Sequence, residues 1–425
     1  MSVVNKVVAP PYHVQLTAEN VRNGFPYFKH HDSISALWLD KWRMPCSKAL
    51  YPFGDAKVED FDPIFATLAK VTNNQTDILF QPDDYVKHFL PLAETRLEEA
   101  SAAEAQGDES KASELYLRSA AIYRISRFPL NRSSLSESSW QLGKQTYIKG
   151  ARFLDPPIVP QNIPFIYADA AAGDKAEDIQ AFIRMPKGKA PEGGWPVLLF
   201  ICGLDAYKTD NTSRTDVHVQ HGFATILFEI PGTGDSPAAP SDPTSPDRLM
   251  SSVLDWVESN GAPYNFNLKQ ICARGISTGG YYAMRIAHTH ADRLLAVVSQ
   301  GGGAHHMFDP EWIGAQNQME YPYALADALA YKFGFREASP VEAYSSGARK
   351  FSLLEAGIFD KPSCKLALVN GLEDSIFPIE DSVICGLSGR NKSLLLRANV
   401  GHMGNPGGEE LVYQFLDEAI KASER

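Results

Sequence analysis

The sequence predicts an α/β protein in which a mostly helical N-terminal domain precedes a larger domain built on a mostly parallel, eight-stranded sheet. Two observations support this expectation. Residues 1–160 carry apolar side chains at helical spacing, and Pro156-Pro157 and Pro160 end that pattern. After them come short β-rich runs, of which the later ones alternate with helix-length segments. We therefore expect one domain over residues 1–160 and a second over residues 161–425.

The N-terminal domain contains a predicted antiparallel helix hairpin. Its first helix runs from Leu92 through Ala105, and its second helix runs from Ser110 to Ser126 after a turn that contains Gly107. Two shorter amphipathic segments cover Ile34 to Trp42 and Phe61 to Val71. Because no second copy of the hairpin follows at a fixed period, the pattern favours a helical cap or docking domain over a solenoid.

Eight short segments of the second domain are predicted strands. The early ones lie close together along the chain and the later ones are separated by helices, which is typical of a doubly wound sheet with helices on both faces. The sixth and seventh lie too far apart for a simple crossover, so residues 304–361 are expected to form an inserted cap with a helix over Tyr323–Phe333. The predicted strands are Ile163–Tyr167, Ile179–Met185, Val197–Cys202, Ala224–Ile230, Gln270–Arg274, Leu295–Ser299, Lys365–Asn370 and Ser393–Arg397.

Composition and charge exclude several classes of protein. A chain of 425 residues with 44% hydrophobic content can form two sizeable cores. Its formal net charge of -11 would repel phosphate backbones, so we expect no nucleic acid partner. No run approaches the roughly 18 to 20 apolar residues that a membrane helix needs, and the N-terminus lacks a basic start followed by an apolar stretch. We therefore expect no membrane span and a cytoplasmic location.

The cysteines point to a reducing compartment. There are five, widely scattered and without a C-x-x-C pair, which argues against both a disulfide framework and a structural zinc site. Nucleotide motifs are missing too, because Gly232-Thr-Gly234-Asp-Ser-Pro237 has proline at the third glycine of a dinucleotide fingerprint. With no H-E-x-x-H either, we expect no cofactor and no metal.

The clearest chemical motif is Gly275-Ile276-Ser277-Thr278-Gly279, which lies between a predicted strand and the predicted helix Tyr281–His290. G-x-S-x-G in that position is typical of a nucleophile elbow, where a strained turn exposes the serine and the glycines let neighbouring backbone approach. The alternative is a glycine-rich turn with an incidental serine. The order of strand, turn and helix favours the elbow.

A serine hydroxyl needs a base that removes its proton, and the base needs a carboxylate that orients it. The last histidine of the chain, His402, directly follows the eighth predicted strand. Asp374 follows the seventh and is the favoured acid, with Glu373 and Asp381 as competitors. The order Ser277, Asp374, His402 is that of the α/β-hydrolases, so we expect the α/β-hydrolase fold.

An oxyanion formed by attack of Ser277 on a carbonyl would need backbone N–H donors. The residue after the nucleophile, Thr278, is expected to supply one of them. The second should come from the loop after the third predicted strand, where Leu204 is the first choice and Asp205 the next.

With these motifs in place, the chain resembles the fungal yellowish-green heptaketide hydrolases of dihydroxynaphthalene-melanin biosynthesis, members of the α/β-hydrolase superfamily. The similarity runs from about Ser33 onward. Two stretches depart from that family: Thr278 stands where alanine is usual, and Gly302-Gly-Ala-His-His306 differs from the usual loop. The similar stretches include Lys41-Trp42-Arg43, Tyr51-Pro52-Phe53, Tyr123-Arg-Ile-Ser-Arg-Phe-Pro129, Glu229-Ile-Pro-Gly-Thr233, Ser245-Pro-Asp-Arg-Leu249, Asp309-Pro-Glu-Trp312, Pro378-Ile-Glu-Asp381 and His402-Met-Gly404.

The resemblance implies hydrolysis of a carbon–carbon bond in an aromatic polyketide by a homodimeric enzyme. A naphthopyrone or acylated polyhydroxynaphthalene would give a tetrahydroxynaphthalene and a short acid. Such chemistry is plausible because a carbanion conjugated to phenols is a tolerable leaving group. Candidate pocket residues are Asp205, His305, His306, Trp312 and Tyr321, and Tyr323 and Phe333 are further candidates for stacking on the rings.

Two other functions stay open on the sequence alone. A carboxylesterase or lactonase would use the same nucleophile, base and oxyanion donors. A binding protein without catalysis on the same scaffold is disfavoured, because all three residue types of the triad are present.

Overall fold

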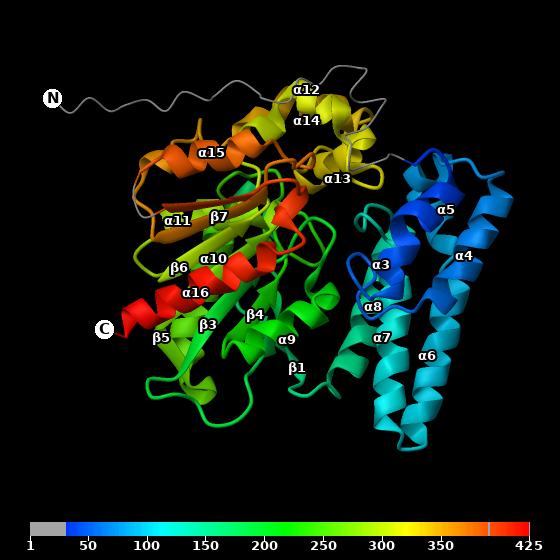
Figure 1. Ribbon diagram of the computed structural model, residues 1–425, viewed down its shortest axis with the longest axis horizontal. Coiled ribbons are helices and arrows are strands. Elements are labelled where there is room, and N and C mark those ends of the chain that lie inside the picture. Colours follow the sequence, from blue (N-terminus) through cyan, green and yellow to red (C-terminus); the bar gives the residue numbers. More distant parts are fainter. Residues whose placement is uncertain (1–30, 390–391, 425) are drawn as a thin grey trace.

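The computed structural model describes residues 31–389 and 392–424, and it contains one eight-stranded sheet (Figure 1). The strand order is β1-β2-β4-β3-β5-β6-β7-β8, with antiparallel pairing from β1 to β2 and from β2 to β4, and parallel pairing elsewhere. The predicted α/β-hydrolase fold is confirmed. The strands are β1 (Ile158–Ile163), β2 (Ile179–Arg184), β3 (Trp195–Ile201), β4 (Ala224–Phe228), β5 (Phe266–Ile276), β6 (Ala296–Gln300), β7 (Lys365–Gly371) and β8 (Lys392–Arg397).

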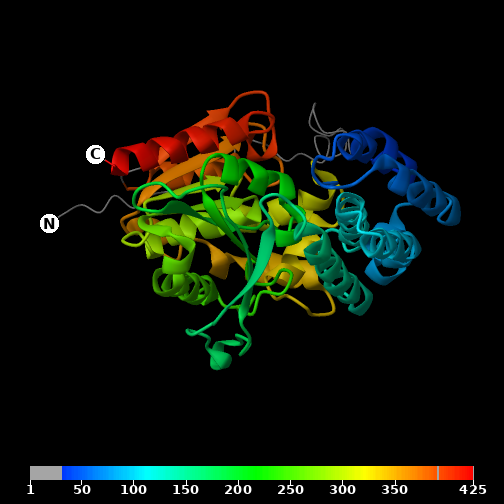
Figure 2. The same ribbon diagram turned by 90° about the horizontal axis from the view of Figure 1, so that it is seen from below.

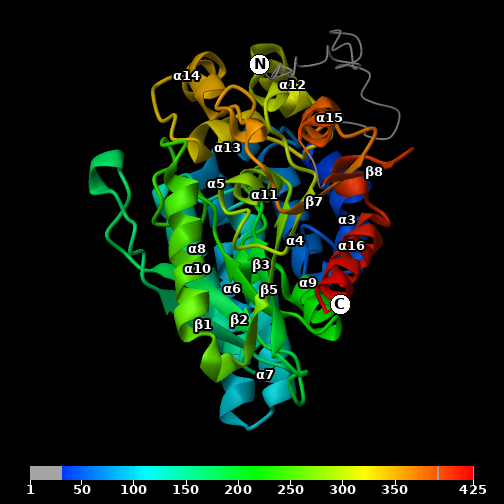
Figure 3. The same ribbon diagram turned by 90° about the vertical axis from the view of Figure 1, so that its left-hand side faces the viewer.

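Helices cover both faces of the sheet (Figure 3). On one face lie α9 (Thr212–Gln220) and α16 (Gly408–Ser423), and on the other lie α10 (Ser245–Asn260) and α11 (Thr278–Thr289). Successive residues of β3 pack against helices on opposite faces of the sheet. Leu198 belongs to the apolar cluster that contains residues of α16, while Leu199 belongs to the cluster that contains residues of α10 and α11. A central strand buried on both faces explains its continuous apolar sequence.

Strand β1 lies earlier in the chain than expected. The sequence placed the first strand at Ile163–Tyr167, whereas β1 ends at Ile163 and includes Pro160. The helical pattern does end before Pro160, which lies in β1. Because β1 is an edge strand, a residue without an N–H is tolerated there, since one side of the strand has no partner. The last helix of the N-terminal segment ends at Ala151, so the change from helix to sheet falls between Ala151 and Ile158.

Most of the N-terminal helices stand to one side of the sheet, as Figures 1 and 2 show. The last of them, α8 (Ser134–Ala151), packs against the sheet, where the Tyr147 ring stacks on the Phe182 ring of β2 at 5.8 Å. The predicted hairpin is present as α6 and α7, and α8 packs against α7. No pattern in the sequence predicted α8. The helices are α2 (Ile34–Ala36), a π-helical turn (Leu37–Trp42), α3 (Arg43–Ser47), α4 (Val58–Val71), a 3-10 turn (Asp77–Phe80), α5 (Pro82–Lys87), α6 (Leu90–Ala105), α7 (Glu109–Ser126) and α8 (Ser134–Ala151).

The segment between β6 and β7 forms the inserted helices α12 (Pro310–Ala315), α13 (Leu325–Lys332) and α14 (Pro340–Gly347), and α15 (Ile379–Leu387) follows β7. The insertion meets the N-terminal helices through aromatic side chains. The Tyr323 ring lies 5.8 Å from the Trp42 ring, and its hydroxyl donates to the Phe128 carbonyl at 3.3 Å. In the described part of the chain, no helix is long and apolar enough to cross a membrane.

Candidate active site

Ser277 occupies a strained turn between β5 and α11. Its φ of 52° and ψ of -124° lie outside the regions that most residues adopt. The flanking glycines make the turn possible, because a Cβ on Gly275 would lie 2.1 Å from the Gly279 carbonyl oxygen, and a Cβ on Gly279 would lie 2.4 Å from the Cys202 carbonyl oxygen. The geometry is that of a nucleophile elbow.

Ser277, His402 and Asp374 meet at the carboxyl ends of β5, β8 and β7. His402 Nε2 lies 2.9 Å from Ser277 Oγ, and His402 Nδ1 lies 3.0 Å from Asp374 Oδ2. Asp374 is 3% exposed. Its other oxygen accepts the backbone N–H groups of Ile376 and Phe377 at 2.8 and 3.1 Å. In this hydrogen-bonded chain Ser277 can serve as a nucleophile, His402 as its base and Asp374 as the carboxylate that orients the base.

The two competing acids lie elsewhere. Asp381 is fully buried on α15, where its carboxylate accepts the backbone N–H groups of Ala304, His306 and Met307 at 2.7 to 3.1 Å. It therefore holds the loop after β6. Glu373 donates its backbone N–H to the Val400 carbonyl at 3.1 Å, and among the residues that the structure describes its buried Oε2 has no hydrogen-bond partner. Asp374 is the carboxylate that contacts His402.

The loop after β3 runs along the elbow. A Cβ on Gly203 would lie 3.6 Å from the Ser277 Cβ, so the next residues, Leu204 and Asp205, are beside the nucleophile. Thr278 is the first residue of α11, where backbone N–H groups have no partner within the helix. All three candidate oxyanion residues line the same cavity as Ser277.

A cavity of about 1340 Å³ opens at Ser277 and His402. Its wall comes from segments that are far apart in sequence: the N-terminal helices, the loops that carry Ser277 and His402, the insertion, and the helices α9 and α16. The N-terminal segment contributes Trp42, Leu50 and Tyr51, and the insertion contributes Tyr321 and Leu325. The volume exceeds the roughly 300 to 1000 Å³ typical of ligand pockets, so a fused-ring ligand fits.

Three of the candidate pocket residues lie outside this cavity wall. His305 Nδ1 lies 2.7 Å from Ser352 Oγ, and His306 Nδ1 lies 2.7 Å from Asp309 Oδ2. Trp312 donates its indole N–H to the Ile376 carbonyl at 3.2 Å. Each is thus directed into the packing beneath the insertion, as are the stacking candidates Tyr323 and Phe333, whereas Asp205 and Tyr321 do line the cavity.

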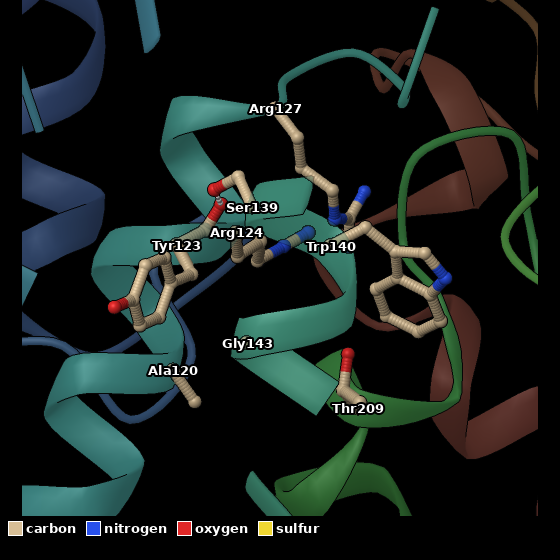
Figure 4. Close-up of a pocket in the computed structure, with 8 residues that line it drawn as sticks. All are labelled: Ala120, Tyr123, Arg124, Arg127, Ser139, Trp140, Gly143 and Thr209. Atoms are coloured by element: carbon tan, nitrogen blue, oxygen red, sulfur yellow. Dashed lines mark hydrogen bonds between the residues drawn. The ribbon is translucent and has the colours of Figure 1, made fainter. Parts of the chain in front are cut away.

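Arg124 on α7 and Arg127, which directly follows α7, support the loop after β3. The guanidinium of Arg127 donates to the Asp205 carbonyl at 3.2 Å and pairs with the Asp210 carboxylate, and Arg124 Nε lies 3.2 Å from Asp210. Figure 4 shows both guanidinium groups reaching from α7 toward Trp140 and the segment that carries Thr209. The space between these side chains has no room for a ligand. The side chains themselves hold the loop after β3 in place.

Glu320 was missed by the sequence analysis. It lies in the insertion, lines the cavity and accepts from Ser375 Oγ at 3.2 Å. Burial and the Asp374 carboxylate raise the pKa of Glu320 to about 7, although His402 opposes this. Burial alone would lower the pKa of His402, but Asp374 most of all, and then Glu320 and Asp205, raise it above its usual value. No local motif marks Glu320, because its partners are more than 50 residues away.

We expect Glu320→Gln to shift the acid limb of the kcat/KM–pH profile to lower pH. A raised pKa keeps His402 protonated to higher pH, and only the neutral imidazole can act as base, so activity falls as the pH drops through that pKa. The Glu320→Gln change removes one of the carboxylates that raise the pKa of His402, so the pKa of His402 falls. The isosteric amide keeps an acceptor for Ser375, so the plateau should change by less than about tenfold. The control is Glu410→Gln, a change on α16 at the cavity wall, and its pH profile should match that of the wild type. If the acid limb of the Glu320→Gln profile lay at the same pH as that of the wild type, the expectation would be wrong.

The sheet and the elbow define the class: the protein is an α/β hydrolase. More narrowly, the chain belongs to the Esterase FrsA-like family, whose sequence profile matches residues 93–404. It is 26% identical over 300 residues to Esterase FrsA of Escherichia coli O157:H7, with 68% of this chain and 66% of that protein covered. Esterase FrsA of Escherichia coli strain K12 gives the same identity over 301 residues. The chain thus spans just under two thirds of the length of these relatives.

Solved structures agree on the fold. The 2,6-dihydroxy-pseudo-oxynicotine hydrolase superposes with a TM-score of 0.62 at 19% identity, covering 79% of this chain and 87% of that one. AbyA5 superposes with a TM-score of 0.55 at 19% identity, covering 77% and 92%. At this identity the similarity establishes the fold alone.

Proposed function

We propose that the protein is a serine hydrolase that shortens an aromatic polyketide by hydrolysis of a carbon–carbon bond. The observation that carries the proposal is the cavity of about 1340 Å³ at Ser277, to which the N-terminal helices and the insertion contribute aromatic side chains. A site with these dimensions suits a fused-ring substrate. The resemblance to heptaketide hydrolases supplies the substrate class.

The proposed reaction has two halves. His402 takes the hydroxyl proton as Ser277 Oγ attacks the side-chain ketone, and backbone donors at Thr278 and at Leu204 or Asp205 stabilise the oxyanion. The bond to the ring then breaks, its electron pair passes to the aromatic fragment, and the proton on His402 returns to that fragment at carbon. Water, deprotonated by His402, attacks the acyl group on Ser277 and releases a short acid. Asp374 keeps the imidazole in the required tautomer throughout.

An esterase or lactonase is the second candidate, and the family match favours it. The triad serves both reactions, since an ester also passes through an acyl-enzyme. The two differ in the leaving group: an alkoxide or phenolate leaves easily, whereas a carbanion leaves only when the ring stabilises it.

Chromatography of paired substrates separates the two candidates. We would incubate the full chain with an acylated polyhydroxynaphthalene and with a naphthyl ester of the same acid, in chelator, with Ser277→Ala as control. The proposal expects loss of the acyl side chain with one equivalent of acid per naphthol. Rapid ester turnover with an intact acyl ketone would instead establish the esterase.

A further inference from the structure

The carboxylate of Asp205 is bonded to two tyrosines from segments that are far apart in sequence. Tyr51 comes from the N-terminal segment and Tyr321 from the insertion, and both hydroxyls donate to Asp205 Oδ2. All three residues line the cavity that contains Ser277. Asp205 follows Leu204 directly, so this cluster lies beside the candidate oxyanion loop.

Residues at the end of α7 and directly after it hold this cluster in place. Arg127 donates to the Asp205 carbonyl, the Arg124 guanidinium lies 5.4 Å from the centre of the Tyr51 ring, and the Phe128 ring stacks on Tyr321 at 5.6 Å with an interplanar angle of 14°. Arg124, Arg127 and Phe128, which lie within about one helical turn at and just after the end of α7, thus each contact one of the three members. Preorganisation of this kind lowers the entropic cost of binding a ligand.

A buried carboxylate usually forms an ion pair with a nearby cation, but Asp205 does not form one with the described residues. The neighbouring cations, Arg124 and Arg127, pair with Asp210 instead, and within residues 31–389 and 392–424 no ion pair reaches Asp205. The described residues also supply no hydrogen bond to Asp205 Oδ1, because both phenols donate to Oδ2. A buried carboxylate with an unused oxygen in a cavity wall is suited to a donor from a ligand.

The cluster offers acceptors only. Burial and the Asp205 carboxylate raise the pKa of both phenols well above their usual value. Each phenol therefore stays protonated and donates its hydrogen bond to Asp205. What remains for a ligand is the unused carboxylate oxygen and the lone pairs of the two phenol oxygens. A ligand that binds here must therefore bring hydroxyl donors, and an ether oxygen at the same position would face other acceptors.

We propose that Tyr51, Asp205 and Tyr321 form a subsite that binds the hydroxyl groups of a polyhydroxylated aromatic substrate and so places its acyl carbon at Ser277. The subsite rests on the proposed function for the identity of that substrate, but its recognition of phenolic hydroxyls is independent of which bond is broken. It assigns specificity to residues contributed by three separate segments of the chain.

Binding without turnover tests the subsite. Calorimetry with the full chain would compare naphthalene-1,3-diol with 1,3-dimethoxynaphthalene. Wild type should bind the diol at least about tenfold more tightly than its ether. Tyr51→Phe and Tyr321→Phe should each weaken diol binding about tenfold and leave ether binding unchanged. The matched control is Tyr323→Phe, whose hydroxyl bonds to the Phe128 carbonyl rather than to Asp205, and it should bind both ligands like wild type.

Several outcomes would overturn the subsite: no binding of the diol by wild type, equal affinity for diol and ether, or equal loss of both ligands in the phenylalanine variants. The subsite and the proposed function fail separately. Diol selectivity in a protein that leaves acyl naphthols intact would refute only the carbon–carbon hydrolase. Turnover of acyl naphthols that is indifferent to Tyr51→Phe and Tyr321→Phe, with no diol selectivity, would refute only the subsite.

Discussion

Ser277→Ala should reduce kcat/KM by about 100,000-fold while the fold is retained. The hydroxyl oxygen is the atom that His402 contacts, at 2.9 Å, so its removal leaves the base with nothing to activate. Folding should be little affected, because alanine meets the same backbone strain at φ 52° and fills less space beside Gly203. Circular dichroism and the thermal midpoint would check the fold, and steady-state kinetics on an aryl ester would measure the loss.

Labelling makes this expectation specific to Ser277. A fluorophosphonate should modify wild type with one equivalent, and peptide mass mapping should place the label on Ser277. The matched control is Ser213→Ala, which removes a serine hydroxyl of α9 from the cavity wall and should retain both activity and labelling. Label on another residue, or activity of Ser277→Ala within tenfold of wild type, would contradict the assignment.

Local signals in the sequence were sufficient for most of the fold. Predicted strands such as Ala224–Ile230 and Lys365–Asn370 begin at the observed residues of β4 and β7, because burial on both faces leaves continuous apolar runs. The elbow could be predicted for the same reason: the close approach of Gly279 to the Cys202 carbonyl permits no side chain, and that restriction is visible in the sequence.

Contacts between distant segments could not be predicted in this way. Tyr51 reaches Asp205 across 154 residues, and Lys41 reaches the Glu320 carbonyl across 279. No spacing rule connects such pairs, so the sequence did not single out Tyr51 or Glu320. The same limit explains the misplaced His305 and His306: being next to β6 in sequence fixes where their backbone lies, but Ser352 and Asp309 decide where their rings point.

Asp374→Asn should lower kcat about 10,000-fold, through the tautomer of His402 rather than through unfolding. The new amide can still accept the Ile376 and Phe377 N–H groups through one oxygen. Its NH₂ group would then face His402 Nδ1, which must become an acceptor, so the proton moves to Nε2 and the base points a donor at Ser277. Because Asp374 is also the main group that raises the pKa of His402, the residual activity should persist to lower pH than that of wild type.

Asp381→Asn is the control that separates geometry from charge. Burial raises the pKa of Asp381 to about 6, and its carboxylate accepts three backbone N–H groups of the loop after β6. An amide can accept through one oxygen only, so this variant should lose stability, seen as a lower denaturation midpoint, yet kcat per folded molecule should stay within tenfold of wild type. Because Asp374 contacts the imidazole and Asp381 does not, the opposite ranking of the two kcat values would move the acid of the triad to α15 and require a rearranged loop after β7.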